Sequence, residues 1–411
     1  MATTKYSHAF LVGSLNVDAL QPDNLDLNLW KRQILSTVEY EKLKSDYYKG
    51  LVDSMVEAEG QTRPNLLDAV QHFSISMDTE CKSPMKICLT KGLKKIPYDY
   101  SLCLCQLHLY FFPHDVVLVS IEIDDTGTDL DLMTLGHGSL INLQFNDTGN
   151  EDFLEKVKPL TNLLKDNDLK HLVKDGNNLK ILQIVEVEAE RPDDKLLYEI
   201  GAFLPVGAVG GNGPLSPSDA YFSSIMSENS VSAFFNWKAL ALVDSFTVLG
   251  VNGFNTWTWL HHYYPLIYLR CIFEKTFCFS RNSAYRLGCG AKDLSLQIAD
   301  MEKYYFYDNI SYNFLPTMLH AAMSKGLGLK EEREEISKQI KERAKEEDEK
   351  RQNRITLGLS AFAIFSVAWD LCSIYMKAFT GDDNRTPAIF LFFVSFIAII
   401  VLAIYIYRKK K

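Results

Sequence analysis

The sequence lacks several features that define common classes of protein. Its 411 residues contain eight cysteines without the dense spacing of a disulfide framework, and the N-terminus has no basic, apolar leader. The formal net charge of −9 gives none of the basic excess that coating a nucleic acid requires. No zinc signature, nucleophile elbow or paired acid and base is recognisable. These absences predict a reduced, cytosolic domain, no nucleic-acid polymer as a partner, and no enzyme activity.

Long apolar runs occur only near the C-terminus. Residues 388–407 carry no charge over 20 residues, which corresponds to about 30 Å of helix. Residues 355–376 have a similar length but contain Asp370, and the short segment 377–387 joins the two runs. The basic tail 408–411 places both ends of this hairpin in the cytosol by the positive-inside rule. The pattern predicts a multi-pass protein of the inner or plasma membrane with two transmembrane helices.

The first of these runs has a polar side. A carboxylate facing lipid costs about 2.5–3.5 kcal/mol on insertion scales, so Asp370 is expected to face a bundle interior. Two helices cannot provide such an interior, which predicts a homo-oligomer with a central pore. The predicted pore-lining residues are Thr356, Ser360, Ala363, Val367, Asp370 and Ile374, and those of the outer mouth are Lys377, Asp382 and Asp383. The alternative is an ordinary anchor in which Asp370 lies near the interface.

The remaining sequence predicts an α/β domain followed by a helical stalk. Alternating polarity predicts strands at residues 101–112 and 116–123, with weaker signals at 179–187 and 239–249. Helical patterns cover residues 255–279, 292–323 and 330–354, the last continuing into the first membrane helix. The predicted domains are a sensor domain over 1–250, a helical layer and stalk over 251–354, and then the membrane helix, loop, membrane helix and tail at 355–376, 377–387, 388–407 and 408–411.

This order of elements resembles the CorA family of divalent-cation channels, most clearly over residues 255–411. The resemblance implies five subunits, a first membrane helix that lines the pore, contact with membrane lipid, and Mg²⁺ as a permeant or regulatory ion. The Gly-Met-Asn signature of that family is missing, because Tyr375 and Met376 are followed by Lys377. A ring of lysines near the mouth would repel divalent cations.

Divergent CorA-like proteins include antiviral membrane effectors of type III CRISPR systems, which respond to nucleotide second messengers. The missing signature suits this branch, and the implied gating ligand is an adenine nucleotide messenger such as a conjugate of S-adenosylmethionine and AMP. An ion channel of this effector type is the favoured function. A magnesium or divalent-cation transporter is the alternative, and a membrane-anchored interaction protein is the second alternative.

One group of residues has the composition of a metal site. Cys103, Cys105, His108 and His114 fall close together in the sequence. Side chains alternate along a regular strand, so the two cysteines would share one face and the two histidines the other. The spacing therefore predicts that these four residues do not bind one ion.

Three further segments are candidates for ligand contacts. Asp124 and Asp125 end a predicted strand and could hold a regulatory divalent ion, although capping of the next helix by Asp129 is the favoured role of this run. His261 and His262 are adjacent and would point about 100° apart on a helix, so they would not share an ion. A glycine-rich segment could contact nucleotide phosphates or be a flexible connector; its candidate residues are Gly207, Gly210, Gly211, Asn212 and Gly213.

Overall fold

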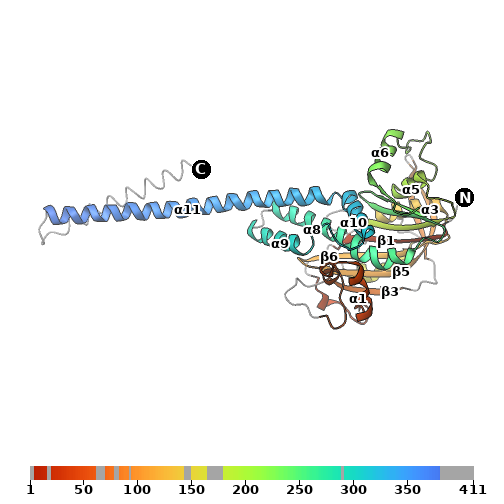
Figure 1. Ribbon diagram of the computed structural model, residues 1–411, viewed down its shortest axis with the longest axis horizontal. Helices are drawn as coiled ribbons and strands as arrows, with labels where there is room; N and C mark the ends of the chain where they lie inside the picture. The colour runs from red at the N-terminus through yellow and green to blue at the C-terminus, as the bar shows by residue number, and fades with distance from the viewer. Residues whose placement is uncertain are drawn as a thin grey trace. The chain divides into compact units, whose positions relative to one another are not determined.

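The computed structural model consists of two compact units, residues 1–337 and residues 338–411. It describes residues 4–15, 20–61, 70–77, 83–91, 94–142, 150–163, 179–287 and 291–379. The first unit contains the sheet and most of the helices (Figure 1). The described part of the second unit is the continuation of one long helix.

A ten-stranded sheet, mostly antiparallel, organises the first unit. Its strands follow the order β2-β3-β5-β6-β1-β7-β10-β9-β8, with β4 paired to β5 outside this path, and β7 and β10 form a parallel pair. The strands are β1 Tyr6–Ser14, β2 Lys31–Arg32, β3 Gln71–Ser76, β4 Ser83–Lys91, β5 Lys94–Phe112, β6 Val116–Asp124, β7 Lys180–Val187, β8 Ser230–Val231, β9 Trp237–Ala241 and β10 Ser245–Val251.

Several helices begin where the sequence supplies a capping side chain, among them α1 and α3. Ser36 and Glu39 form a capping box at the start of α1, and the Asp129 side chain accepts hydrogen bonds from the backbone at the start of α3, as predicted. The helices are η1 Pro22–Asn24, α1 Thr37–Asp46, α2 Lys49–Met55, α3 Leu130–Ile141, α4 Glu151–Thr161, α5 Asp194–Gly201, α6 Asp219–Asn229, α7 Thr256–Thr258, η4 Trp259–Tyr268, α8 Leu269–Arg286, α9 Ala291–Tyr304, α10 Phe314–Leu327 and α11 Leu329–Phe379.

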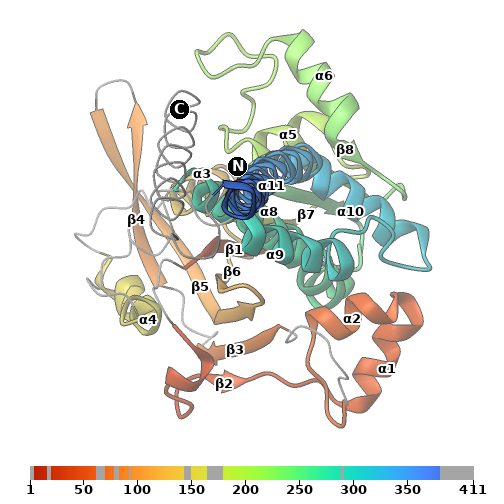
Figure 2. The same cartoon turned by 90° about the vertical axis from the view of Figure 1, so that its left-hand side faces the viewer.

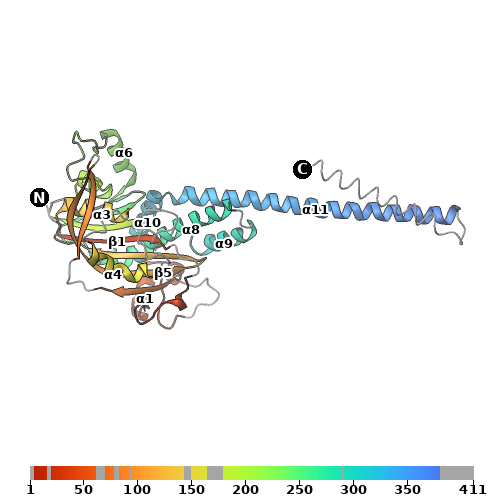
Figure 3. The same cartoon turned by 180° about the vertical axis from the view of Figure 1, so that it is seen from behind.

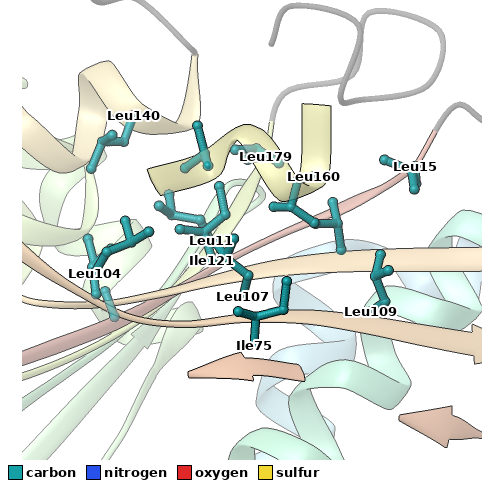
Figure 4. Packing of buried hydrophobic residues seen from close by; sticks show 14 of the residues in the cluster. Leu11, Leu15, Ile75, Leu104, Leu107, Leu109, Ile121, Leu140, Leu160 and Leu179 are labelled. Carbon is teal, nitrogen blue, oxygen red and sulfur yellow. The ribbon is translucent and has the colours of Figure 1, made fainter. Parts of the chain in front are cut away.

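Helices cover both faces of the sheet. Helices α3, α4 and α5 pack on one face, named here the α3 face, where Leu11, Leu107 and Ile121 meet Leu140 and Leu160 (Figure 4). Figure 3 shows α3 and α4 against the strands from behind. Helices η4, α8 and α10 pack on the opposite face, the α8 face. Truncation of one fully buried leucine to alanine in such a core costs about 2–5 kcal/mol.

The pleat of the central strands sends two different sets of side chains to these faces. On β6, Ile121 and Ile123 enter the core of the α3 face, whereas Ser120, Glu122 and Asp124 point to the α8 face. The helical pair α1 and α2 lies beside β3 at one edge of the sheet (Figure 2). Space between this pair, helix η4 and the α8 face forms the pocket described below.

A buried ionic cluster fixes the base of α11 to α8. Arg270 and Glu274 are fully buried, and the Arg270 Nε donates a hydrogen bond of 2.9 Å to Glu274. Arg333, in the second turn of α11, donates to the other oxygen of the same carboxylate. Breaking a buried pair by removing one partner typically costs about 3–5 kcal/mol, so the first turns of α11 belong energetically to the first unit.

Most of the predicted secondary structure is present. Strands β5, β6 and β7 confirm three predicted strands, and α11 confirms the helix over 330–354. The weak signal at 239–249 is instead a hairpin of β9 and β10. The single helix predicted over 292–323 is wrong, because residues between Tyr304 and Phe314 leave the helix, where Asn309, Ser311 and Asn313 favour turns.

The predicted membrane fold is not supported. Among the described residues, no helix combines the length and the apolar character needed to cross a membrane. Helix α11 is long, but charged residues fill its first half, and Ser360, Ser366 and Asp370 interrupt its apolar half. The second predicted span, 388–407, lies outside the described residues. The predictions of a two-helix membrane hairpin and of a multi-pass location in the inner or plasma membrane are therefore wrong.

The predicted pore residues lie on α11 or beyond it. The described ones from Thr356 to Ile374 are on this helix and are exposed in the structure. Lys377 belongs to its last turn, and Asp382 and Asp383 lie outside the described residues. The assignment of these residues to a pore stays a prediction.

Candidate functional site

A pocket of about 490 Å³ opens on the α8 face of the sheet. Three parts of the chain form its walls: strands β1, β3, β5 and β6, the N-terminal segment with α1 and α2, and helix η4. The sheet contributes Phe10, His72, Gln106, His108, Tyr110 and Glu122. The register explains this grouping, because cross-strand partners share a face and His72 pairs with Tyr110 while Gln106 pairs with Glu122.

A chain of hydrogen bonds runs from the pocket into the sheet. His72 Nε2 lies 3.0 Å from His108 Nδ1, and His108 Nε2 lies 2.9 Å from Glu122 Oε2. An ionised carboxylate only accepts, so His108 donates from Nε2. In the tautomer in which the Nδ1 of His108 accepts, the Nε2–H of His72 donates to it, and the Nδ1 of neutral His72 is an acceptor.

The second oxygen of Glu122 holds another histidine. Glu122 Oε1 lies 2.8 Å from His8 Nε2, and Asp124 lies 4.0 Å from His8 Nδ1. Burial opposes ionisation of Glu122, but the hydrogen bonds from His108 and His8 outweigh it and lower its pKa to about 2. Burial likewise opposes charging of His8, whereas the two carboxylates raise its pKa to about 9. His8 and Glu122 therefore form an ion pair at neutral pH.

Burial and the neighbouring His108 lower the pKa of His72 well below its usual value. His72 is therefore neutral at physiological pH, as the hydrogen-bond chain requires. The hydrogen-bond chain from Glu122 therefore ends at an uncharged ring, that of His72.

Aromatic rings line much of the pocket. Tyr110 stacks on His72 with a ring separation of 4.3 Å, and Tyr264 stacks on Phe10 at 3.6 Å. Trp257 is 47% exposed, and the Lys42 ammonium lies 4.9 Å from the centre of its ring. Helix η4 is a π-helix, a form that is rare and frequent at functional sites.

A β-bulge brings Cys105 and His108 to the same region. The register of β5 and β6 shifts between Leu104 and Gln106, so Cys105 is an extra residue and the alternation of side chains is reset. Donor atoms of Cys105, His8 and Glu122 all lie within 4.8 Å of one another. The argument that placed Cys105 and His108 on opposite faces was wrong here, because both adjoin Glu122. His114 instead lies in the turn after β5, with its ring tilted against that of Phe277 at a separation of 5.5 Å.

A second polar cluster lies on the α3 face. Asp125 and His137 are fully buried 3.1 Å apart, and Tyr100 donates a hydrogen bond of 2.6 Å to Asp125. The other nitrogen of His137 lies 2.7 Å from Gln183 Oε1, and Gln183 donates to Thr247. Burial alone would lower the pKa of His137, but the charge of Asp125 raises it. The ring thus lies between Asp125 and Gln183, and the raised pKa favours its charged form.

The candidate divalent site at Asp124 and Asp125 is not assembled. Asp124 adjoins His8 on the α8 face, whereas Asp125 enters the cluster on the α3 face. The two carboxylates therefore point away from each other, as successive side chains on a strand do.

The glycine-rich segment already holds a carboxylate. The backbone amides of Gly207 and Val209 donate to the two oxygens of buried Glu199, at 3.0 and 2.7 Å. These amides are consequently not free for a phosphate. Gly207 and Gly210 have positive φ angles, which supports a turn, and this segment is not among the residues that line the pocket.

The pocket contains residues that the sequence did not single out. His261 and His262 both line it, and each ring lies near Trp257. His8, His72 and Glu122 were missed. A signal for two of them exists in the sequence, since His8 and Glu122 are ionisable residues inside largely apolar strands, a placement that favours a buried partner.

Comparisons of the chain with protein-family models, with curated proteins and with solved structures give no match. The resemblance to the CorA family therefore stays a prediction.

Proposed function

We propose that residues 1–337 form a ligand-sensing module that binds an aromatic heterocycle of the adenine type in the pocket. The observation that carries this proposal is the hydrogen-bond chain from Glu122 through His108 to His72, whose ring lines the pocket. In the tautomer described above, the Nδ1 of His72 matches a ligand with an N–H or O–H donor. Rings such as Trp257 supply surfaces on which a planar ligand can stack.

The charge of the pocket supports one class of adenine compound over another. Three carboxylates, Glu39, Glu57 and Glu122, line the pocket, against the single lysine Lys42. Arg32 pairs with Glu57 and His8 with Glu122, so the pocket offers no excess of positive charge to a di- or triphosphate, whereas a nucleoside requires none. The predicted adenine nucleotide messenger, including a conjugate with S-adenosylmethionine, can present its base to the same acceptor.

Calorimetric titration of the full chain with adenosine is the direct test. We expect saturable binding at one site per chain, and much weaker binding of ATP. Trp257→Ala should weaken adenosine binding by about 1–3 kcal/mol, or about 5- to 150-fold, because base-aromatic stacking has this magnitude. Phe235→Ala is the matched control, since Phe235 is 80% exposed and is not part of the pocket.

Two outcomes would contradict the proposal. ATP binding more tightly than adenosine would indicate a phosphate site elsewhere. Equal losses of adenosine affinity in Trp257→Ala and Phe235→Ala would mean that adenosine does not bind in the pocket.

The proposal concerns binding without turnover. The absence of enzyme activity stays a prediction, and its measure is the recovery of unchanged adenosine after prolonged incubation with the protein.

A further inference from the structure

Three strands converge beside Glu122, which lines the pocket. β1 contributes His8, β6 contributes Glu122, and the bulge in β5 contributes Cys105. The ligand atoms of these three side chains lie within 4.8 Å of one another. In a tetrahedral site with bonds of about 2.0–2.3 Å, ligand atoms lie about 3.3–3.8 Å apart. The His8 nitrogen and the Glu122 oxygen lie 2.8 Å apart and would open by about 0.5 Å, whereas the Cys105 sulfur would approach by about 1.5 Å or less.

We infer that His8, Cys105 and Glu122 form a binding site for a transition-metal ion of the zinc class. This inference goes beyond the ligand pocket proposed above and does not depend on it. The ligand set combines sulfur, nitrogen and oxygen, which suits Zn²⁺ and related ions. Mg²⁺ and Ca²⁺ require oxygen ligands, which this trio supplies only from Glu122.

The surroundings of the trio orient its members as in known metal sites. His108 holds the second oxygen of Glu122 at 2.9 Å, and Asp124 lies 4.0 Å from the Nδ1 of His8, leaving Nε2 directed toward Glu122. Carboxylates and histidines in these positions fix the orientation of metal ligands. Three protein ligands leave a fourth position for water or for another ligand.

The bulge completes the surroundings of the trio. Leu104 lies in the apolar core of the α3 face, so its neighbour Cys105 points to the α8 face. The extra residue resets the alternation, so that Gln106 and His108 point to the α8 face as well. Cys103 pairs across the strands with Asp124 and is not within the trio. This difference between two cysteines of one strand provides a matched control.

Titration of the chelator-treated full chain with Co²⁺ tests the inference. We expect one Co²⁺ per chain to produce a thiolate-to-cobalt charge-transfer band in the near ultraviolet together with intense visible bands of tetrahedral cobalt. Zn²⁺ should displace it, and Mg²⁺ in large excess should not. Cys105→Ser should abolish the charge-transfer band, whereas Cys103→Ser should retain it. His108→Gln should weaken Co²⁺ binding about 10- to 100-fold while keeping the band.

Three results would overturn the inference. They are the absence of a charge-transfer band at saturating Co²⁺, a band that survives Cys105→Ser, and displacement of Co²⁺ by Mg²⁺. Circular dichroism of each metal-free variant confirms that a lost band does not come from unfolding. Since adenosine binding is measured on metal-free protein, failure of the metal site and failure of the pocket are separate results.

Discussion

Two polar clusters lie on opposite faces of the same sheet, and they differ in where their hydrogen bonds end. On the α3 face, Asp125 and His137 are fully buried and their network ends inside the core, at Gln183 and Thr247. On the α8 face, the network that starts at Glu122 ends at the pocket. A closed network stabilises and specifies a core, whereas an open one is available to a ligand.

The two clusters also differ in how their charges are balanced. The α3 face holds one carboxylate, Asp125, and one histidine, His137, whose pKa that carboxylate raises. On the α8 face, Glu122 accepts from two histidines, and the thiol of Cys105 adjoins them with a pKa that burial and the nearby carboxylates raise to about 12. A metal ion can replace the protons of such a cluster, but it cannot reach the sealed pair.

The largest expected effect is a difference between the two clusters in the free energy of unfolding that is lost when a carboxylate is neutralised. Asp125→Asn removes one charge of a fully buried pair and should lower the free energy of unfolding by about 3–5 kcal/mol. Glu122→Gln, beside a pocket that water can enter, should cost about 1–2 kcal/mol. Urea-induced unfolding of both variants measures the difference. Equal losses would mean that the two clusters are equally structural.

The pH dependence of stability should sharpen the same distinction. Burial alone would raise the pKa of Asp125, but the charge of His137 lowers it below its usual value. The stability that ionised Asp125 contributes is present above pH 3.8 and is lost as the pH falls through the lowered pKa. The pKa of His137 is raised, so the opposite holds for this group. The stability that charged His137 contributes is present below pH 6.5 and is lost as the pH rises through the raised pKa.

Melting temperatures of wild type and Asp125→Asn between pH 3 and pH 9 measure the loss of stability at low and at high pH. The difference between the two proteins should be largest near pH 5 and should shrink toward both ends of the range. A difference in melting temperature that does not vary with pH would mean that the ion pair of Asp125 and His137 does not cause it.

The third prediction concerns the pocket end of the open cluster. His72→Phe keeps an aromatic ring beside Tyr110 but removes the acceptor nitrogen, so adenosine affinity should fall about 10-fold. Purine riboside, which lacks the exocyclic amino group, provides the matched comparison. Wild type should prefer adenosine to purine riboside about 10-fold, and His72→Phe should not distinguish them. A preference that persists in His72→Phe would place the amino group elsewhere.

The smallest effect on either cluster is expected from changes on α11. Its residues from Ile355 to Ile374 include exposed apolar side chains such as Phe362, which is 74% exposed, and homo-oligomerisation stays a prediction. Light scattering should give a multiple of the 46.8 kDa chain mass, with a pentamer as the predicted state. Phe362→Ser should weaken association and leave adenosine affinity within about twofold. A wild-type monomer would contradict the prediction of self-association.

The comparison also marks what periodicity in the sequence can and cannot predict. Alternating polarity located β5 and β6, and the capping pattern located the start of α3 at Asp129. Alternation failed at Cys105, because a bulge inserts one residue without any mark in the sequence. The pocket could not be predicted, because its walls come from segments separated by about 200 residues, such as those around Leu43 and Trp257, that only the fold brings together.

Apolar composition misled in a different way. The run at 355–376 has the length of a membrane span, but length and average composition do not define one when Asp370 and several hydroxyl groups interrupt it. The glycine-rich segment at 206–213 misled for a related reason, since its amides serve Glu199, a partner that the sequence does not reveal.

Nitrogen-15 NMR of the histidine rings tests the central claim most directly, because it reports the charge and the hydrogen bonds of both clusters in one sample. We predict a neutral ring for His72, protonated on Nε2, and a doubly protonated ring for His137. Saturating adenosine should shift the signals of His72 and His108 and leave those of His137 unchanged. Signals of His72 that do not respond to adenosine, or that respond no more than those of His137, would contradict the assignment of the open cluster as the binding site.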